Sequence, residues 1–245
     1  MKIPSKYDRL CFPKKSMRVE YLNSLSKTIR RAELRQLPFL ARMDAKLFSR
    51  KVYLKVEGVP RKAVHASTDP FLMVNVLDDL GNLTNYPADV NAADLGGGLC
   101  AAVTTLDYYL KCLMNRGITS KFHVTSFEMS DKLNMEAENI IRIMGMEEHI
   151  SIIKRDFTEL TKEHLKLFNL IYISWPFLED FGPVMNKVFP RINSGTTLIA
   201  RNCSEATILE DRSFFSPYYD PRLIKYGGHV RFYSRTDKEV PQESK

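Results

Sequence analysis

The chain has 245 residues, a formal net charge of +7, a hydrophobic fraction of 44% and an aromatic fraction of 11%. This composition can form a packed core, and it excludes a chain that is disordered throughout. No apolar run reaches the ~18–20 residues that cross a bilayer, and no apolar stretch follows the charged start as in a secretory signal. The length suits one large α/β domain or a core with a smaller appendage, in a protein expected to be cytoplasmic.

The positive charge is concentrated at the start of the chain. Residues 1–62 contain 17 Lys+Arg and 5 Asp+Glu, whereas the remainder contains 19 and 24. Lys27, Arg31 and Arg35 recur every four residues, so on a helix they form one basic stripe. Such a stripe attracts polyanions such as RNA, or it is only a solvated helical face, and the charge alone leaves both interpretations open.

The four cysteines are scattered, with no CxxC and no Cys/His cluster: Cys11, Cys100, Cys112 and Cys203. This spacing favours neither a disulfide framework nor a structural zinc site, so we expect no metal. Hydrolytic motifs such as G-x-S-x-G or H-E-x-x-H are also missing from the sequence.

A mainly helical N-terminal segment is predicted for residues 1–88, as a lid or substrate platform. Apolar residues at helical spacing predict a helix over 17–37, with a further helix over 39–48 and a short strand over 52–56. Asp69 and Pro70 form a helix start, in which Asp69 is the N-cap. We expect this helix to run through Leu80 and to end at Gly81, with a link over 82–91.

Residues 89–245 alternate between short strands and helices. Strands are predicted near 92–95, 122–127, 150–153, 170–173 and 197–200, with intervening helices over 99–114, 130–144 and 158–166 and from Gly182. This alternation predicts an α/β fold: a three-layer, doubly wound, mainly parallel sheet. Residues 230–234 form a clear last strand, and a further strand is either missing or supplied by 207–219.

Ligands of such sheets bind beyond the carboxyl ends of the strands, so the residues there are candidates for a site. Gly96, Gly97 and Gly98 permit a tight turn and close approach to the backbone. Glu128 is suited to accept hydrogen bonds from both ribose hydroxyls. Asp156 could accept from a purine amine, with Phe157 as an apolar wall. Each carboxylate could instead cap the following helix.

This constellation resembles the class I S-adenosylmethionine-dependent methyltransferases, which are Rossmann-like, over residues 88–202. Asp94, Gly96 and Gly98 match their D/E-x-G-x-G-x-G motif, and Cys100 stands at the last glycine. The resemblance implies S-adenosyl-L-methionine as cofactor, with Glu128 on the ribose, Asp156 on the adenine amine, and Gly96 and Gly98 beneath the methionyl part. The implied cofactor site is completed by Asp94, Gly97, Met129, Phe157 and Ser174.

A nicotinamide or flavin cofactor is the alternative within this fold, because residues 96–101 also fit G-x-G-x-x-A. Asp94 lies two residues before the first glycine, where dinucleotide-binding strands are normally apolar. Asp156 is also better explained as an adenine partner in the smaller cofactor. Both features favour the methyl donor.

The exit of the fourth strand of this sheet supplies the catalytic candidates, which are Trp175, Glu179 and Asp180. Trp175 could stack on a substrate, and the two acids could orient or deprotonate an amine. The alternatives are rim packing for the tryptophan and exposed acids at a helix start. Pro176 and Phe177 resemble half of the N/D-P-P-F/Y signature of amino-group methyltransferases.

The tail resembles nicotianamine synthase-like enzymes in Arg201-Asn202 and in a run of aromatic, proline and glycine residues over 214–228. That resemblance implies transfer of the aminocarboxypropyl arm of the same cofactor. The predicted function is methyl transfer from S-adenosylmethionine to RNA or a small molecule. The two alternatives are aminocarboxypropyl transfer and a non-catalytic Rossmann-like protein that binds partners through its basic face.

Overall fold

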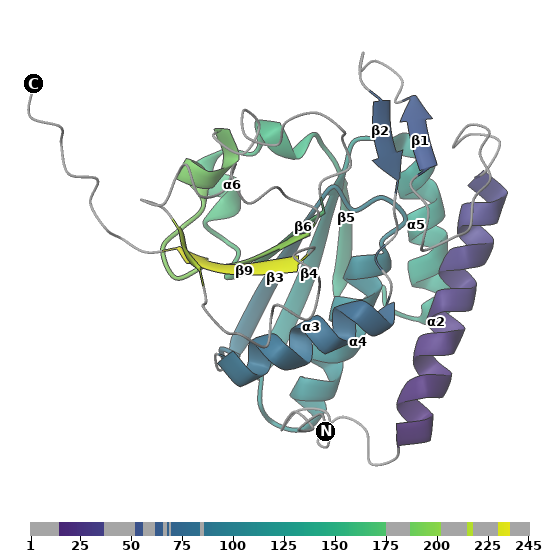
Figure 1. The fold of residues 1–245 in the computed structure, drawn as a ribbon, viewed down its shortest axis with the longest axis horizontal. Coiled ribbons are helices and arrows are strands. Elements are labelled where there is room, and N and C mark those ends of the chain that lie inside the picture. The colour runs from purple at the N-terminus through teal and green to yellow at the C-terminus, as the bar shows by residue number, and fades with distance from the viewer. Residues whose placement is uncertain are drawn as a thin grey trace, which may run out of the picture.

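The computed structural model describes residues 15–36, 52–55, 62–65, 68, 70–83, 86–174, 187–201, 215–217 and 230–235. These residues contain a seven-stranded sheet of order β5-β4-β3-β6-β7-β9-β8 (Figure 1). The first five strands in this order are parallel, whereas β9 is antiparallel to β7 and β8 is antiparallel to β9. The strands are β3 (Asp89–Leu95), β4 (Lys121–Glu128), β5 (Ile150–Lys154), β6 (Leu170–Ser174), β7 (Thr197–Arg201), β8 (Phe215–Pro217) and β9 (Val230–Arg235).

The predicted α/β fold with a mainly parallel sheet is confirmed. The open question about the last strands is also answered, because β8 lies within 207–219 and pairs with β9. The start of β3 was predicted wrongly: β3 begins at Asp89, inside the expected link, because residues 89–91 pair with β4, beginning with Asp89 opposite Lys121. Hydrogen bonding to the neighbouring strand thus extends β3 beyond its apolar residues.

The helices of the described residues are α2 (Lys15–Gln36), α3 (Pro70–Leu83), α4 (Ala101–Asn115), α5 (Asp131–Met144) and α6 (Lys162–Leu165), with short 3₁₀ turns η1 (Phe157–Glu159) and η2 (Phe189–Arg191). The expected caps of α5 are present, since the Ser130 hydroxyl accepts from the backbone N–H of Leu133 and Gly145 takes a left-handed φ of 65°. By contrast, the continuous helix predicted over 158–166 is wrong, because Leu160 and Thr161 are extended and separate η1 from α6. The predicted end of α3 is also wrong, since α3 does not end at Gly81. This glycine is buried and the helix continues to Leu83, so tertiary packing overrides its tendency to end a helix.

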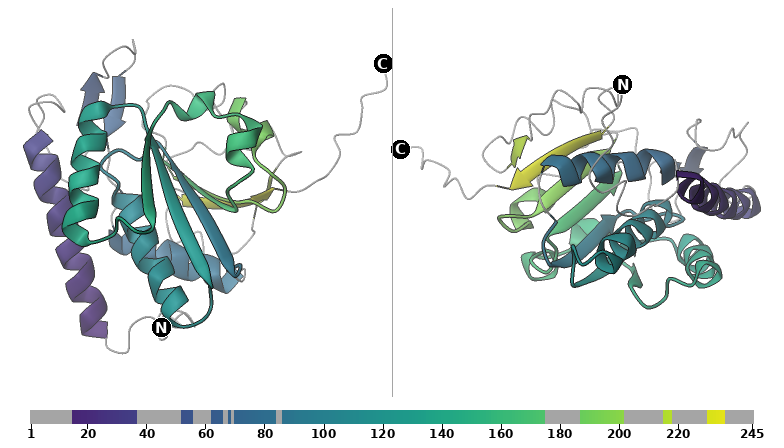
Figure 2. Two further views of the ribbon diagram at one scale, coloured as in Figure 1. Left: turned by 180° about the vertical axis from the view of Figure 1, so that it is seen from behind. Right: turned by 90° about the horizontal axis from the view of Figure 1, so that it is seen from below.

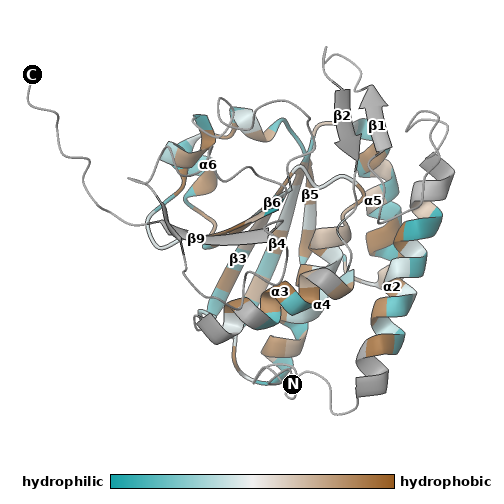
Figure 3. Cartoon of the chain, in the orientation of Figure 1, coloured by the Kyte–Doolittle hydropathy of each residue, from teal (hydrophilic) through white to brown (hydrophobic). Residues whose placement is uncertain are grey.

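Helices cover both faces of the sheet and enclose two cores (Figures 2 and 3). On one face α3, α4 and α5 pack on the side chains of Ala92, Val124 and Tyr172. On the other face η1, α6 and η2 pack on Ala93, Ile171 and Ala200. Alternate residues of one strand therefore serve opposite cores, which identifies the face to which each polar side chain at the strand ends belongs.

Helix α2 lies beside α5 at one side of the sheet (Figures 1 and 2). Leu25 and Ile29 are fully buried against Ala101, and each contributes about 1.5–3 kcal/mol through burial. The ring of Tyr21 stacks on that of Tyr108, with 3.7 Å between centroids. The helix predicted over 17–37 is thus confirmed, and its apolar stripe is used for packing against the α/β core.

Before α3 the chain forms a small antiparallel pair, β1 (Val52–Lys55) with β2 (Lys62–His65). The first strand was expected and its partner was not. The helix predicted over 39–48, the Asp69 cap and the helix predicted from Gly182 lie outside the described residues. None of the helices in the described part of the chain is both long and apolar enough to pass through a membrane.

Strand β3 connects through α4 to β4 on one side, whereas its other neighbour is β6. The order of the strands reverses direction at this pair, so the switch point of the sheet lies between the carboxyl ends of β3 and β6. Asp94 of β3 stands directly beside Tyr172 of β6 at this point. The ligand site is therefore expected here.

Candidate functional site

Three polar side chains occupy one row across the centre of the sheet, near its carboxyl edge. Asp94 is in register with Ser126 of β4 and with Tyr172 of β6. Neighbours in register point to the same face, so all three lie on the side covered by α3 and α4. All three are buried, with 2% of each side chain exposed. Such a concentration of buried polar groups is uncommon in a parallel sheet, whose strands are usually apolar throughout.

The glycine turn follows β3 and bends sharply against β4. The backbone N–H groups of Gly96 and Gly97 both donate to the carbonyl oxygen of Phe127, at 2.9 and 3.0 Å. Gly96 has a φ of +89°, which favours glycine. A Cβ atom on Gly97 would lie 1.8 Å from the hydroxyl oxygen of Ser126. Glycine is therefore required at both positions by the backbone of this turn and by its contact with β4.

The backbone of Cys100 shows how a residue other than glycine fits the last position of the glycine motif. Cys100 is the only non-glycine residue with a positive φ in the described part of the chain, at 54°, and it caps the start of α4. A left-handed conformation costs a residue with a Cβ about 1–2 kcal/mol relative to glycine. The side chain is fully buried, and its thiol donates to the carbonyl oxygen of Ala137 at 3.6 Å. The chain thus keeps the backbone of the missing glycine and adds a packing contact with α5.

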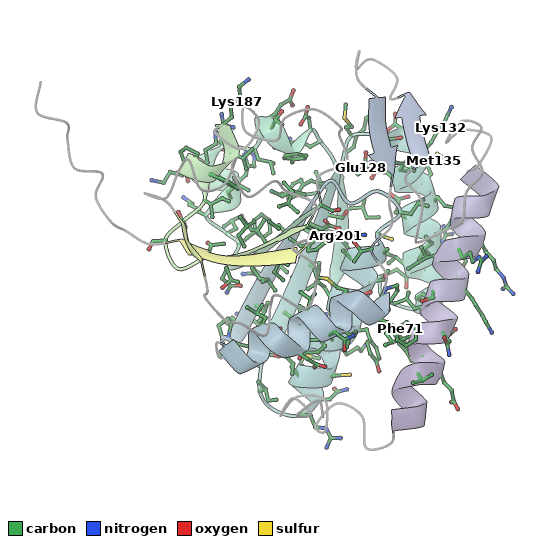
Figure 4. The ribbon with its side chains drawn as sticks, in the orientation of Figure 1. Phe71, Glu128, Lys132, Met135, Lys187 and Arg201 are labelled. Carbon is green, nitrogen blue, oxygen red and sulfur yellow. The ribbon has the colours of Figure 1, made fainter. Side chains whose placement is uncertain are left out.

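Glu128 links the glycine turn to the start of α5. One carboxylate oxygen accepts from the backbone N–H of Gly98 at 3.0 Å, and the other accepts from the N–H of Ser130 at 2.9 Å. The residue is half-buried at the end of β4, where Figure 4 labels it at the carboxyl edge of the sheet. Each carboxylate oxygen has a second lone pair, so both can also accept from a ligand hydroxyl.

Asp94 is the most perturbed acid of the site. Burial, together with the smaller effect of the nearby negative charge of Glu128, raises its pKa to about 8. Its Oδ1 atom has no hydrogen-bond partner among the described residues. Because a buried, unpaired carboxylate oxygen costs about 1–3 kcal/mol, its position favours a cationic or hydrogen-bond-donating ligand.

Asp156 and Phe157 follow β5, as predicted. The Asp156 carboxylate accepts from the backbone N–H of Thr158 at 2.8 Å and caps η1, so the expected capping role is present. The Phe157 ring is buried, and its Cε1 atom would lie 3.9 Å from a Cβ on Gly96. The structure therefore brings Phe157 to the glycine turn, and a role of Asp156 toward adenine stays a prediction.

Of the other predicted site residues, two lie at strand ends in the described part of the chain and three lie outside it. Met129 is half-buried directly after Glu128, and Ser174 is half-buried at the end of β6. Trp175, Glu179 and Asp180 lie outside the described residues. Within the described residues, no three His, Cys, Asp or Glu side chains are arranged to hold a metal ion, and neither Cys100 nor Cys112 forms a disulfide bond.

Sequence reasoning missed a hydrogen-bonded group beside Asp94. Thr68 precedes α3, and its hydroxyl lies 2.7 Å from that of Tyr172. Arg201, the last residue of β7, donates from Nη1 to the Thr68 hydroxyl at 3.2 Å. Arg201 was recognisable as the residue after the fifth strand of the parallel set, but its partners are 133 and 29 positions away in the sequence, and only folding joins them.

The fold was compared with known proteins. No protein-family model and no curated sequence matches this chain. Among solved structures, a protein described as an S-adenosyl-L-methionine-dependent methyltransferase from Methanococcus maripaludis aligns with a TM-score of 0.50 and 16% identity over 70% of this chain and 86% of that one. A protein from Listeria monocytogenes, described as a class I enzyme of the same kind, aligns with a TM-score of 0.53 and 12% identity over 73% and 64%. The chain therefore has the Rossmann-like fold of class I methyltransferases.

We predict that Gly97→Ala destabilises the fold by about 1–3 kcal/mol, because the added methyl group overlaps the Ser126 side chain. Removing the hydroxyl with Ser126→Ala leaves a contact of 3.2 Å to the Ser126 Cβ, which small shifts can accommodate. The double variant should recover most of the loss. Urea unfolding of both single variants and the double variant measures this coupling, and purely additive effects would contradict the contact.

A second prediction concerns the pH dependence of stability. The pKa of Asp94 is about 8 in the fold and about 3.9 in an unfolded chain, so the unfolded state releases this proton first as the pH rises. The wild type therefore loses stability between about pH 4 and pH 8, and the Asp94→Asn variant lacks this loss. The unfolding free energy of the variant minus that of the wild type should increase over this range. A constant difference in urea unfolding would show that Asp94 is not the buried acid described above.

Proposed function

We propose that this protein is an S-adenosylmethionine-dependent methyltransferase. The observation that carries the proposal is the arrangement at the switch point, where a glycine turn, the Glu128 carboxylate and the buried Asp94 carboxylate meet at one edge of the sheet. The fold neighbours described as methyltransferases support the same function.

The residues present fit this cofactor at each of its parts. Glu128 accepts from the ribose hydroxyls while it keeps its backbone contacts. Phe157 provides the apolar surface for the adenine, and Asp156 lies one residue before it. Asp94 has an unpaired oxygen that suits the ammonium group of the methionyl end. A cation there would offset the desolvation that raises the pKa of Asp94.

The cofactor supplies a methyl group on a positively charged sulfur, which is a good leaving group. The task of the protein is then to bind the cofactor and to align an acceptor with the methyl carbon. The glycine turn allows close approach of the cofactor to the backbone, and the resemblance implies that the acceptor lies near the end of β6. Trp175, Glu179 and Asp180 remain candidates for orienting that acceptor.

Two alternatives have less support. A dinucleotide carries no ammonium group to pair with the buried oxygen of Asp94, so the cost of leaving that oxygen without a partner would remain. The nicotianamine synthase-like resemblance depends on residues 201–202 and 214–228, of which Arg201 and Phe215–Pro217 lie within the described residues. Neither reported fold neighbour is described as an enzyme of that kind.

Isothermal titration with S-adenosylmethionine tests the cofactor. We expect the wild type to bind it, and Glu128→Gln to weaken binding by about 10- to 100-fold, since a charge-assisted hydrogen bond contributes about 1.5–3 kcal/mol. Glu138→Gln on the exposed face of α5 is the matched control and should bind as the wild type does. Binding of NAD with none of S-adenosylmethionine would overturn the proposal.

RNA is the acceptor class that the first helix supports. Lys27, Arg30 and Arg31 of α2 are exposed, whereas Leu25 and Ile29 hold the opposite side of the helix against the core. The helix is therefore fixed in place with its basic side outward, which is the arrangement that binds a phosphate backbone. Arg35 of the predicted stripe belongs to α2, and its side chain lies outside the described residues.

Neutralising the three exposed bases together with Lys27→Gln, Arg30→Gln and Arg31→Gln should weaken binding of a labelled RNA hairpin. It should also reduce the slope of log K against log salt by about 2–3, because each lost phosphate contact removes about 0.7–0.9. The control changes the same charge on other elements, with Lys121→Gln, Lys162→Gln and Lys166→Gln. If both triple variants lose the same affinity in an anisotropy titration, α2 is not the binding surface.

A further inference from the structure

Arg201, Thr68 and Tyr172 form a hydrogen-bonded group at the carboxyl ends of β6 and β7. The Thr68 hydroxyl is 2.7 Å from the Tyr172 hydroxyl and accepts from Nη1 of Arg201 at 3.2 Å. Arg201 also acts on the Tyr172 hydroxyl, where it opposes the rise in pKa that burial causes. Thr68 and Tyr172 are 5% and 2% exposed, so two buried hydroxyls orient a guanidinium that is itself only half-buried. The Arg201 side chain is thus held by partners whose own positions are set by the core.

This group lies on the same face of the sheet as Asp94. Asp94 is in register with Tyr172, and Tyr172 is in register with Ile199. Arg201 comes two residues after Ile199 and so points to the same face. The charge of Asp94 acts on the Tyr172 hydroxyl, as does the charge of Arg201. Tyr172 therefore stands between a carboxylate and a guanidinium at one edge of the sheet. Figure 4 labels Arg201 at this edge, as it does Glu128.

The spacing between Asp94 and Arg201 bears on which ligand the two side chains can bind together. Adjacent strands are about 4.8 Å apart, and Arg201 lies two residues, or about 6.6 Å, beyond the position in register with Asp94, so the two backbones are about 12 Å apart. An α-amino acid carries its ammonium and its carboxylate on a single carbon. A protein that binds both groups needs an acid and a base that flank this carbon, each at hydrogen-bond distance. Asp94 and Arg201 lie on the strands on either side of β6 and on the same face of the sheet, which is the order that such binding requires.

We propose that Arg201, oriented by Thr68 and Tyr172, binds the carboxylate of the cofactor's amino-acid end while Asp94 binds its ammonium. The inference rests on the proposed function, because it takes S-adenosylmethionine as the ligand. Arginine suits this position, since its planar guanidinium pairs with a carboxylate through two parallel hydrogen bonds. The pair would select the complete amino-acid end over shorter adenosine thioethers.

Three ligands distinguish the contact proposed for Arg201 from the contact proposed for Asp94. S-Adenosylmethionine has both charged groups, its decarboxylated form keeps the amine and lacks the carboxylate, and methylthioadenosine lacks both. In calorimetric titrations, Arg201→Gln should weaken binding of S-adenosylmethionine by about 10- to 100-fold and leave the other two ligands unchanged. Asp94→Asn should weaken binding of S-adenosylmethionine and of the decarboxylated form, with methylthioadenosine unchanged. Arg201→Lys retains the charge and should lose less than Arg201→Gln.

Unchanged binding of methylthioadenosine also establishes that each variant is folded at the adenosine end. If Arg201→Gln binds all three ligands as the wild type does, the inference is wrong and the proposed function stands. If the variant loses all three ligands equally, Arg201 supports the structure of the site, and the inference is again wrong. If the wild type binds none of the three ligands, the proposed function itself fails.

Discussion

The hydrogen bond from the Gly98 N–H to the Glu128 carboxylate is the contact on which the rest of the site depends. It ties the turn after β3 to the end of β4, and the second oxygen of the same carboxylate holds the start of α5. One side chain thereby sets the relative positions of two strand ends and of one helix N-terminus. The packing of Gly97 on Ser126 holds the turn at the same place by steric contact. A single half-buried acid thus shapes the surface on which a ligand would lie.

The close packing of the glycine turn leaves an acidic side chain buried behind it, which is electrostatically unfavourable. Asp94 lies behind it, in register with Ser126, in a place that water does not reach. Desolvation there favours the protonated acid, and the Glu128 charge acts in the same direction. A site that keeps an unpaired acid in its core stores free energy that a cationic ligand can recover on binding. Natural proteins tolerate such local conflicts mainly where function requires them.

Several features of this arrangement were predictable because they depend on local chemistry. The strand and helix alternation, the Ser130 and Gly145 caps and the glycine turn all follow from patterns within a few residues. Predictions were less accurate where distant pairing decides the outcome. Strand β3 extends back to Asp89 because β4 offers it partners, and α3 passes Gly81 because that glycine is packed in the interior. The second strand of the β1–β2 pair carries no strong local signal in Lys62–His65.

The sequence by itself determined the fold class, the order of strands and helices along the chain, and which acidic residues end the strands. These features depend on hydrophobic periodicity and on turn residues, which act over short distances. Tertiary structure alone decided which of those residues share a site. Thr68, Tyr172 and Arg201 come from three distant segments, and no spacing along the chain relates them. The unpaired oxygen of Asp94 and the left-handed backbone of Cys100 likewise exist only in the folded protein. Burial and hydrogen bonding between distant segments arise when the layers pack, so a linear pattern does not contain them.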